Sequence, residues 1–154
     1  MIKFSTLENC TIEEITIVFN AAFSDYLMPM KMSLEQMRHK FETENIALHY
    51  SVGAFDNDIL VGFILHFSNT ENGITKIYNG GTGVIKNYRG NNLTRKMYDY
   101  VLPLINKNVS CINLEVLEQN TPAINAYKGI GYELKRKLIC FQGIPKISRT
   151  NEDI

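Results

Sequence analysis

Cysteine is scarce in this sequence, and tryptophan is absent. Cys10, Cys111 and Cys140 lie far apart in the chain and do not have the spacing of metal ligands. An odd number of widely separated cysteines argues against a disulfide framework and favours a reducing compartment. We therefore expect a cytoplasmic protein that needs no metal.

The sequence also lacks an excess of one charge and any long apolar run. Its 16 basic residues balance its 16 acidic residues, so the formal net charge is zero, unlike that of a general nucleic-acid binder. No segment approaches the ~20 apolar residues of a membrane span, and residues 1–8 have no long apolar stretch typical of a secretion signal. We expect neither nucleic acid nor membrane as a partner.

The length of 154 residues and the hydrophobic content of 45% suit one domain with one core. A domain of this size buries about 70% of the surface that its unfolded chain exposes. Two domains of half this length would each be marginal. We therefore predict a single domain over residues 1–145, followed by a tail at 146–154 whose end is frayed.

Two capping boxes predict helices near the N-terminus. Thr11 precedes Glu14 by three residues, and Ser33 precedes Gln36 in the same way. In this motif the hydroxyl and the carboxylate or amide satisfy free amides at a helix start. Apolar residues follow at helical spacing, so we expect one helix after Thr11 and a second that runs to about residue 43.

Strand patterns dominate the middle of the chain. From residue 47 onward apolar residues alternate with less apolar ones, as in a half-buried strand. The triplet at 56–58 and the Asn-Gly pair at 72–73 indicate hairpin turns. The predicted strands cover residues 2–7, 47–54, 59–67 and about 74–85.

The second half alternates between helix and strand. Helical spacing returns over about 92–106, and residues 111–117 have the pattern of a strand. Thr121 followed by Pro122 is typical of an N-cap and the first helical position, and this helix is expected to end near Gly131. One or two strands are predicted within 132–141. The order implies an α/β (α+β) domain with a mixed sheet and right-handed crossovers.

The first chemical signal is a turn between a strand and a helix, over residues 82–96. Gly90, Asn91 and Asn92 tolerate left-handed backbone conformations, and basic residues surround them. Free amides at the following helix start suit phosphate oxygens. Taken alone, an ordinary Gly/Asn turn with solvated basic residues is the favoured interpretation, since the segment lacks the pattern of a nucleotidase phosphate loop.

This turn resembles one motif of the GCN5-related N-acetyltransferase (GNAT) superfamily, Gln/Arg-x-x-Gly-x-Gly/Ala. The sequence has Arg89 at the first position but Asn92 and Thr94 at the two small positions. Asn92 can preserve a left-handed turn. At Thr94, either the diphosphate lies slightly farther out or the hydroxyl contacts it.

A second segment matches the superfamily more completely. Leu-Glu-Val at 114–116 precedes Asn-x-x-Ala-x-x-x-Tyr-x-x-x-Gly-Tyr over 120–132, and every specified position matches at the right spacing. The likeness in element order covers nearly the whole chain. The first 45 residues usually shape the acceptor pocket in such enzymes, and they carry no recognisable signature.

The resemblance implies a mostly antiparallel sheet whose fourth and fifth strands splay apart to admit the pantetheine arm of acetyl-CoA. Backbone groups of the fourth strand pair with that arm, and the turn wraps the diphosphate. The implied contacts with this co-substrate come from Thr82, Gly83, Val84, Arg89, Gly90, Asn91, Asn92, Leu93, Thr94, Arg95, Asn120 and Tyr127. For Asn120, a simple helix-entry turn is an equally good interpretation.

Tyr127 is the predicted catalytic residue. An amine that attacks a thioester creates an oxyanion, which an amide near Val84 can stabilise, and then expels a thiolate that a phenol can protonate. The general base stays open, because Tyr78 occupies the position where some relatives carry glutamate. The alternatives are a water relay or one of the side chains of Asp25, His66, Glu71 and Glu115.

The expected function is therefore transfer of an acetyl group from acetyl-CoA to a primary amine of a small molecule or protein, without a metal. An inactive acyl-CoA sensor with the same fold is the alternative, and a nucleotide-binding protein of another family is a third, less favoured one. The sequence leaves open both the acceptor and whether the protein is a monomer or a homodimer.

Overall fold

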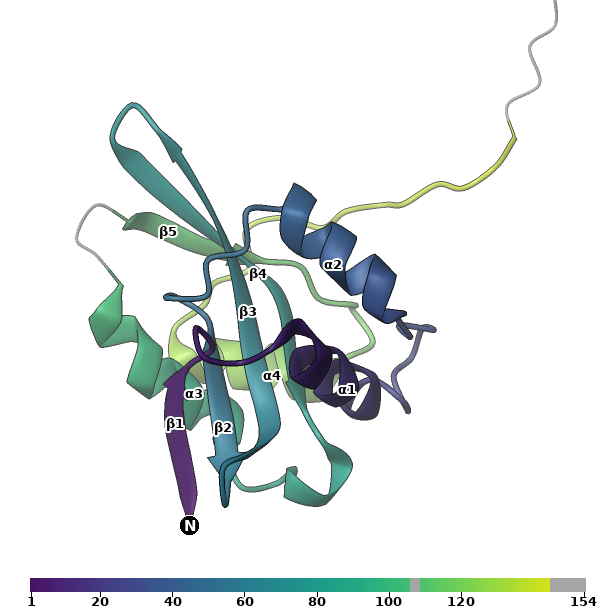
Figure 1. Ribbon diagram of the computed structural model, residues 1–154. Coiled ribbons are helices and arrows are strands. Elements are labelled where there is room, and N and C mark those ends of the chain that lie inside the picture. The colour runs from purple at the N-terminus through teal and green to yellow at the C-terminus, as the bar shows by residue number, and fades with distance from the viewer. Residues whose placement is uncertain (106–108, 145–154) are drawn as a thin grey trace, which may run out of the picture.

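A computed structural model describes residues 1–105 and 109–144 (Figure 1). The predicted tail at 146–154, residue 145 and the last residue of the predicted helix 92–106 lie outside the described residues. The elements in chain order are β1 (Ile2–Thr6), α1 (Ile12–Ala22), α2 (Leu34–Thr43), β2 (Val52–Asp56), β3 (Ile59–Glu71), β4 (Ile74–Val84), a 3-10 turn (Lys86–Tyr88), α3 (Leu93–Val101), a second 3-10 turn (Leu102–Leu104), β5 (Val109–Leu114) and α4 (Thr121–Ile130).

The sheet has five strands in the order β1-β2-β3-β4-β5. Neighbours from β1 to β4 are antiparallel, whereas β4 and β5 are parallel. This confirms the predicted mixed, mostly antiparallel sheet. A parallel pair needs a crossover connection, and α3 supplies it.

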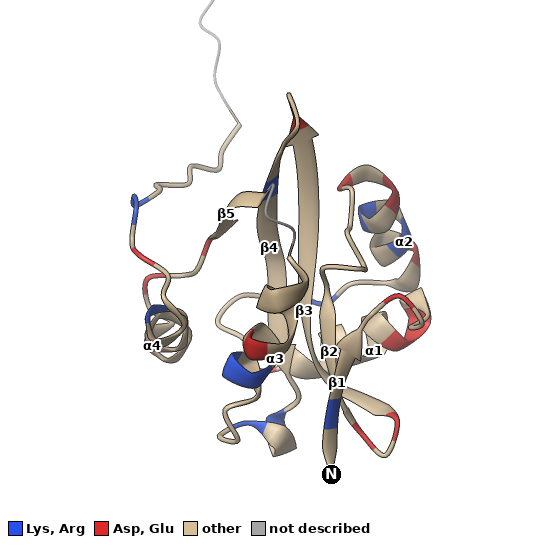
Figure 2. Ribbon diagram, turned by 90° about the vertical axis from the view of Figure 1, so that its left-hand side faces the viewer, with Lys and Arg blue, Asp and Glu red and all other residues tan. Residues whose placement is uncertain are grey.

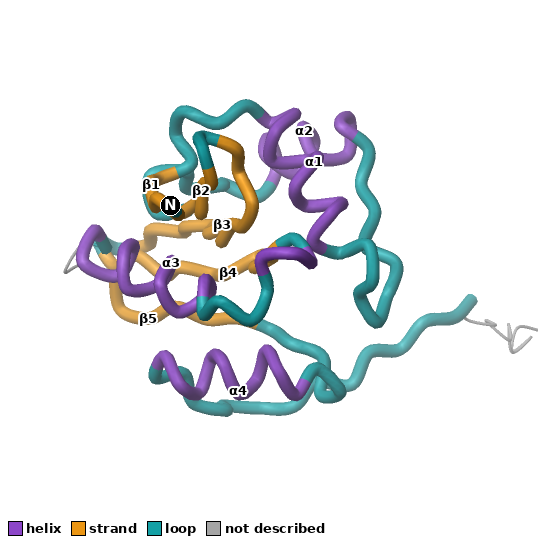
Figure 3. The backbone as a smooth tube through the Cα atoms, turned by 90° about the horizontal axis from the view of Figure 1, so that it is seen from below, coloured by secondary structure: helices purple, strands orange, loops and turns teal. Residues whose placement is uncertain are grey.

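Helices cover both faces of the sheet, with α1 and α2 on one side and α3 and α4 on the other (Figure 3). Alternation along β3 serves both layers: Phe63 belongs to the core cluster under α1, and Ile64 to the cluster under α3. Basic and acidic residues lie on the helices of both layers (Figure 2).

Both predicted capping boxes form. The Thr11 hydroxyl accepts a hydrogen bond from the Glu14 N–H at 3.1 Å, and the Glu14 carboxylate accepts from the Thr11 N–H at 2.8 Å. Ser33 and Gln36 make the same pair of bonds at 3.1 and 2.7 Å. The signal succeeded because all of its partners lie within four residues of one another.

The predicted strand 47–54 begins only at Val52. Residues 47–51 form a turn in which the Tyr50 N–H donates to the Ala47 carbonyl at 2.9 Å. The Ser51 hydroxyl stabilises it by donating to the same carbonyl, and it accepts the His66 N–H at 2.9 Å. The hydrogen bonds of the Ser51 hydroxyl thus favour a turn at 47–51 where the sequence predicted the start of the strand.

Three boundaries in the second half were also wrong. The predicted helix 92–106 ends at Val101 and tightens into a 3-10 turn containing Pro103, which cannot continue an α-helix. The strand predicted at 111–117 spans Val109–Leu114. Asn120, not Thr121, is the N-cap of α4, and its side chain accepts the Ala123 N–H at 3.3 Å.

The strands predicted within 132–141 are absent from the described part of the chain. Residues 133–144 run extended without pairing to any described strand, and Ile139 and Phe141 are 81% and 94% exposed. Alternating apolar residues favour a strand only where a neighbouring strand offers a hydrogen-bonding edge and a surface to pack on.

β4 and β5 splay apart, as the resemblance implied. Their ladder ends where Asn79 pairs with Leu114, although β4 continues to Val84. A bulge lies at the same level: Leu65 pairs with Gly81 and His66 with Asn79, so Gly80 is the extra residue of β4. A Cβ at Gly80 would lie 2.1 Å from the Phe67 ring, so no larger residue fits this bulge without a shift.

Candidate active site

The open edge of β4 presents backbone groups to the gap left by β5. Ile85 N–H donates to the Val61 carbonyl at 3.0 Å, and the register pairs Gly62 with Val84. Because antiparallel residues alternate between bonding inward and outward, the amides of Thr82 and Val84 point toward the gap. Two donors on one strand edge therefore remain available to an extended ligand.

A cavity of about 840 Å³ adjoins this edge. It gathers most of the residues that the sequence predicted to contact coenzyme A: Thr82, Gly83, Val84, Arg89, Gly90, Asn92, Leu93, Thr94 and Asn120. The side chain of Asn91 turns back to the Tyr88 and Arg89 carbonyls. Arg95 instead bonds Asp99 and the Gly129 carbonyl, which ties α3 to α4.

The turn before α3 has the geometry of an anion cradle. Gly90 and Asn92 adopt left-handed conformations with φ of 80° and 58°, as their residue types predicted. Asn92 is the N-cap of α3 but makes no side-chain capping bond. The first amides of the helix therefore lack intrahelical partners, and together with the positive end of the helix dipole they favour a phosphate group.

The Arg89 side chain does not point its donors at this cradle. Its guanidinium bonds both carboxylate oxygens of Asp25 and the Ala22 carbonyl at 2.8 Å, and the Val84 carbonyl at 3.0 Å. These bonds tie the loop after α1 to the end of β4. Bonding to Arg89 also lowers the pKa of Asp25, so this carboxylate is a weaker base than usual.

Tyr127 lines a second, smaller cavity of about 160 Å³, next to the first. Burial raises the pKa of its phenol, and the Thr82 hydroxyl acts in the opposite direction. The phenol is consequently protonated at neutral pH, as a general acid must be. Thr82, Asn120 and Ala123 line both cavities, so the phenol lies where the two meet.

A buried polar network that the sequence analysis missed lies behind Tyr127. The Asn79 side-chain carbonyl accepts the Gly81 N–H at 2.9 Å, which fixes the orientation of its amide. Its NH₂ group then donates to the Thr82 hydroxyl at 2.8 Å and to the Tyr98 hydroxyl at 2.7 Å. Tyr132 donates to Tyr98 at 3.0 Å, and burial raises the pKa of Tyr132 to about 12. No motif in the sequence marks Asn79.

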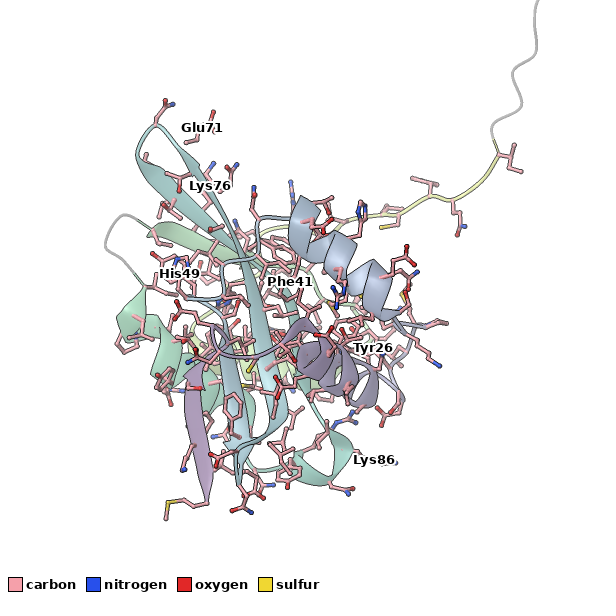
Figure 4. All side chains as sticks on the ribbon, in the orientation of Figure 1. Tyr26, Phe41, His49, Glu71, Lys76 and Lys86 are labelled. Carbon is pink, nitrogen blue, oxygen red and sulfur yellow. The ribbon has the colours of Figure 1, made fainter. Side chains whose placement is uncertain are left out.

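The structure separates the candidates for the general base. Glu71 lies at the tip of the β3–β4 hairpin, far from Tyr26 of the second cavity (Figure 4). His66 is fully buried, and its Nδ1 bonds the Tyr50 carbonyl at 2.6 Å. Asp25 is paired with Arg89. Glu115 lines the second cavity with Tyr127 and Tyr78, whose pKa is raised by burial and by Glu115.

Among the described residues, no group of three or more His, Cys, Asp or Glu side chains could hold a metal ion. Within the same part of the chain, no helix has the length and apolar character to cross a membrane.

A mixed sheet that opens between two parallel strands, with an anion cradle and a protonated phenol at the opening, defines an acyl-CoA-dependent transferase. The chain belongs to the acetyltransferase (GNAT) family, whose model matches residues 14–132. It is thus a GNAT-type acetyltransferase, and the resemblance inferred from the sequence is confirmed. No curated protein sequence matches the chain.

Solved structures with similar folds include Naa50 of Arabidopsis thaliana in complex with the bisubstrate analogue CoA-Ac-MVNAL, at 26% identity and a TM-score of 0.69 over 88% of this chain and 85% of that one. The ribosomal-protein-alanine N-acetyltransferase of Brucella melitensis has 14% identity and a TM-score of 0.71 over 92% and 99%. AAC(6')-Iy in complex with CoA-S-monomethyl-acetylneamine has 14% identity and a TM-score of 0.69 over 93% and 98%.

Proposed function

We propose that the protein transfers the acetyl group of acetyl-CoA directly to a primary amine. The observation that carries this proposal is the junction of the two cavities: the open β4 edge, the uncapped start of α3 and the Tyr127 phenol all border it. A thioester bound along β4 with its diphosphate at α3 would bring its sulfur toward that phenol.

Acetyl-CoA fits the chemistry of the residues present. The outward amides of Thr82 and Val84 suit the amide groups of the pantetheine arm, as an added strand would. The left-handed turn at Gly90 and Asn92, with the free amides of α3, suits the diphosphate. The Asn120 carbonyl caps α4, while its NH₂ group faces the Tyr26 hydroxyl at 3.4 Å and the cavity. The side-chain carbonyl of Asn120 thus serves the helix start, and we assign its NH₂ group to the bound coenzyme A.

The reaction then needs three protein groups. A neutral amine attacks the thioester carbon, and the N–H of Val84 stabilises the oxyanion that forms. The C–S bond breaks, and the leaving thiolate takes the Tyr127 proton. The attacking nitrogen gives up one proton to the base, and Tyr127 regains one from solvent, so one acetyl amide and one thiol are produced and the phenol is restored.

We assign the removal of the amine proton to Glu115. It is the carboxylate that shares a cavity with Tyr127, and it is exposed enough to pass protons to solvent. A water molecule can relay the proton where the amine does not reach the carboxylate itself.

Two measurements test this function. Calorimetry should detect saturable binding of acetyl-CoA, and thiol release should accompany acetylation of at least one amine in a primary-amine library. Tyr127→Phe should lower kcat by about 10²- to 10³-fold while leaving the Kd of coenzyme A within twofold. A sensor without activity would bind acetyl-CoA but release no thiol with any amine, and a chain that does not bind acetyl-CoA would sink the proposal.

A further inference from the structure

We propose, on the basis of the function above, that the acceptor is a monocationic primary amine on a short apolar stem, which enters the second cavity. The same chemistry occurs in two sources, a small aliphatic or aromatic monoamine and the N-terminus of a peptide whose first side chain is apolar. Three properties of the cavity lead to this class: its charge, its lining and its size.

The cavity provides for one positive charge. Of the described residues that line it, Glu115 alone carries a carboxylate, and Tyr78 lies beside it. Asp25 lines the larger cavity, and Arg89 already bonds both of its oxygens. An amine with several charges would thus leave all but one without a partner, and an unpaired charge in a partly desolvated site is costly.

One wall of the cavity is largely apolar and aromatic. Phe23, Tyr26 and Met30 come from the loop after α1, and the Phe23 and Tyr26 rings meet edge to face with centroids 5.1 Å apart. Aromatic rings and a thioether accept an alkyl or aryl stem and also stabilise a nearby ammonium group.

Size points in the same direction. A cavity of about 160 Å³ has the volume of roughly five water molecules. It can hold an aminomethyl group and a few carbon atoms of a stem, whereas a set of linked sugar rings would have to remain outside. The acceptor part of the Naa50 complex, Ac-MVNAL, begins with an apolar residue, whereas that of AAC(6')-Iy is acetylneamine. The cavity suits the first kind of molecule.

The test compares four acceptors by thiol release: phenethylamine, a peptide beginning Met-Val, spermine and neamine. We expect kcat/KM for one or both of the apolar monocations to exceed that for spermine and neamine at least tenfold. The two apolar acceptors distinguish a small-molecule source from a peptide source. A preference for either polycation would overturn the inference while leaving the acetyltransferase function intact, whereas no turnover with any amine would count against the function itself.

Two variants examine the charge directly. Glu115→Gln keeps the shape of an exposed side chain, and it should lower kcat/KM for the apolar monocation at least tenfold without changing the Kd of coenzyme A. The KM for the monocation should rise as well as kcat fall, because loss of the base alone would lower kcat without weakening acceptor binding. Met30→Glu adds a second carboxylate to the cavity and should raise the spermine-to-phenethylamine ratio of kcat/KM at least threefold. Met28→Glu is the matched control, because Met28 is 51% exposed and lines neither cavity. If Met28→Glu changes the spermine-to-phenethylamine ratio as much as Met30→Glu does, the cavity does not select acceptors by their charge. The same conclusion follows if Glu115→Gln leaves kcat/KM for the monocation unchanged.

Discussion

Whether the Tyr127 phenol can give up its proton depends on the direction of the hydrogen bonds around it. Asn79 has a fixed amide orientation and donates to the Thr82 oxygen. The single proton of Thr82 is therefore directed away from Asn79 and is available to the phenol oxygen of Tyr127, whose pKa the Thr82 hydroxyl lowers. In the proposed reaction, Tyr127 then keeps its own proton for the leaving thiolate. This polarity makes Thr82 and Asn79 positioning residues for the acid.

Thr82→Val should lower kcat about tenfold, because it removes the hydroxyl but keeps the β-branched shape in β4. The Thr82 hydroxyl lowers the pKa of Tyr127, so removal of that hydroxyl should raise this pKa. ¹³Cζ-labelled tyrosine NMR, assigned with Tyr127→Phe, would detect the altered phenol.

Thr82→Ser is the matched control and should retain both kcat and the tyrosine resonance. In a Tyr127→Phe background Thr82→Val should cost little further activity, since residues that act as a unit are not additive. Equal losses in both backgrounds would mean that Thr82 acts independently of the phenol.

At the scale of elements, the start of α3 depends on one left-handed residue. Asn92 has φ of 58°, a conformation that glycine adopts freely and that costs other residues roughly 1–2 kcal/mol. Asn92→Ala should therefore lower the free energy of unfolding by about 1 kcal/mol and weaken coenzyme A binding several-fold. Asn92→Gly should preserve both. Urea denaturation and calorimetry measure the two quantities.

Asn91→Ala serves as the control, since Asn91 lies next to Asn92 in the same turn but does not have a positive φ. If Asn92→Ala proves no worse than Asn91→Ala in both assays, then the left-handed turn does not shape the cradle.

The loop after α1 depends on the Arg89–Asp25 pair. Both side chains are about 40% exposed, so solvent screens the pair and weakens it despite its bidentate geometry. Asp25→Asn should raise the acceptor KM about two- to fivefold, because the same loop carries Phe23, Tyr26 and Met30. The Kd of coenzyme A should change less than twofold. Asp58→Asn removes a partner of Lys3 that is 88% exposed, and it should change neither constant. An acceptor KM unaffected by Asp25→Asn would contradict the expected role of the Arg89–Asp25 pair.

At the scale of the whole molecule, His66 links folding to pH. Burial lowers the pKa of this histidine, and its Nε2 has no hydrogen-bond partner among the described residues. The native state therefore keeps the ring neutral, whereas the unfolded chain takes up a proton as the pH falls through about 6.5. The unfolded state then binds more protons, so stability decreases on acidification.

The expected loss from His66 is at most about 1.4 kcal/mol at pH 5.5 relative to neutral pH. Urea denaturation at pH 7.5, 6.5 and 5.5 would measure it. His66→Gln removes the titrating ring and should flatten this dependence, whereas His49→Gln, at an exposed position, should not. An unchanged slope in His66→Gln would show that other groups cause the acid sensitivity.

Short-range sequence motifs predicted much of the fold and of the part of the site assigned to coenzyme A. Capping boxes, the turns at 56–58 and 72–73, and the left-handed residues Gly90 and Asn92 each involve neighbours in sequence, so their physics can be read without the fold. The motif at 120–132 predicted the helix that carries Tyr127 in the same way. The strands expected within 132–141 failed because an apolar alternation does not specify its partner.

The chain's sequence by itself determined where helices begin, where hairpins turn, which family pattern it carries and which phenol is the catalytic candidate. Only the tertiary structure decided which carboxylate shares a cavity with that phenol, that Arg89 binds Asp25 across 64 residues, and that Asn79 orients Thr82 behind it. The physical reason is that bonds between distant segments depend on how the sheet twists, bulges and opens. No spacing along the chain encodes those distances directly.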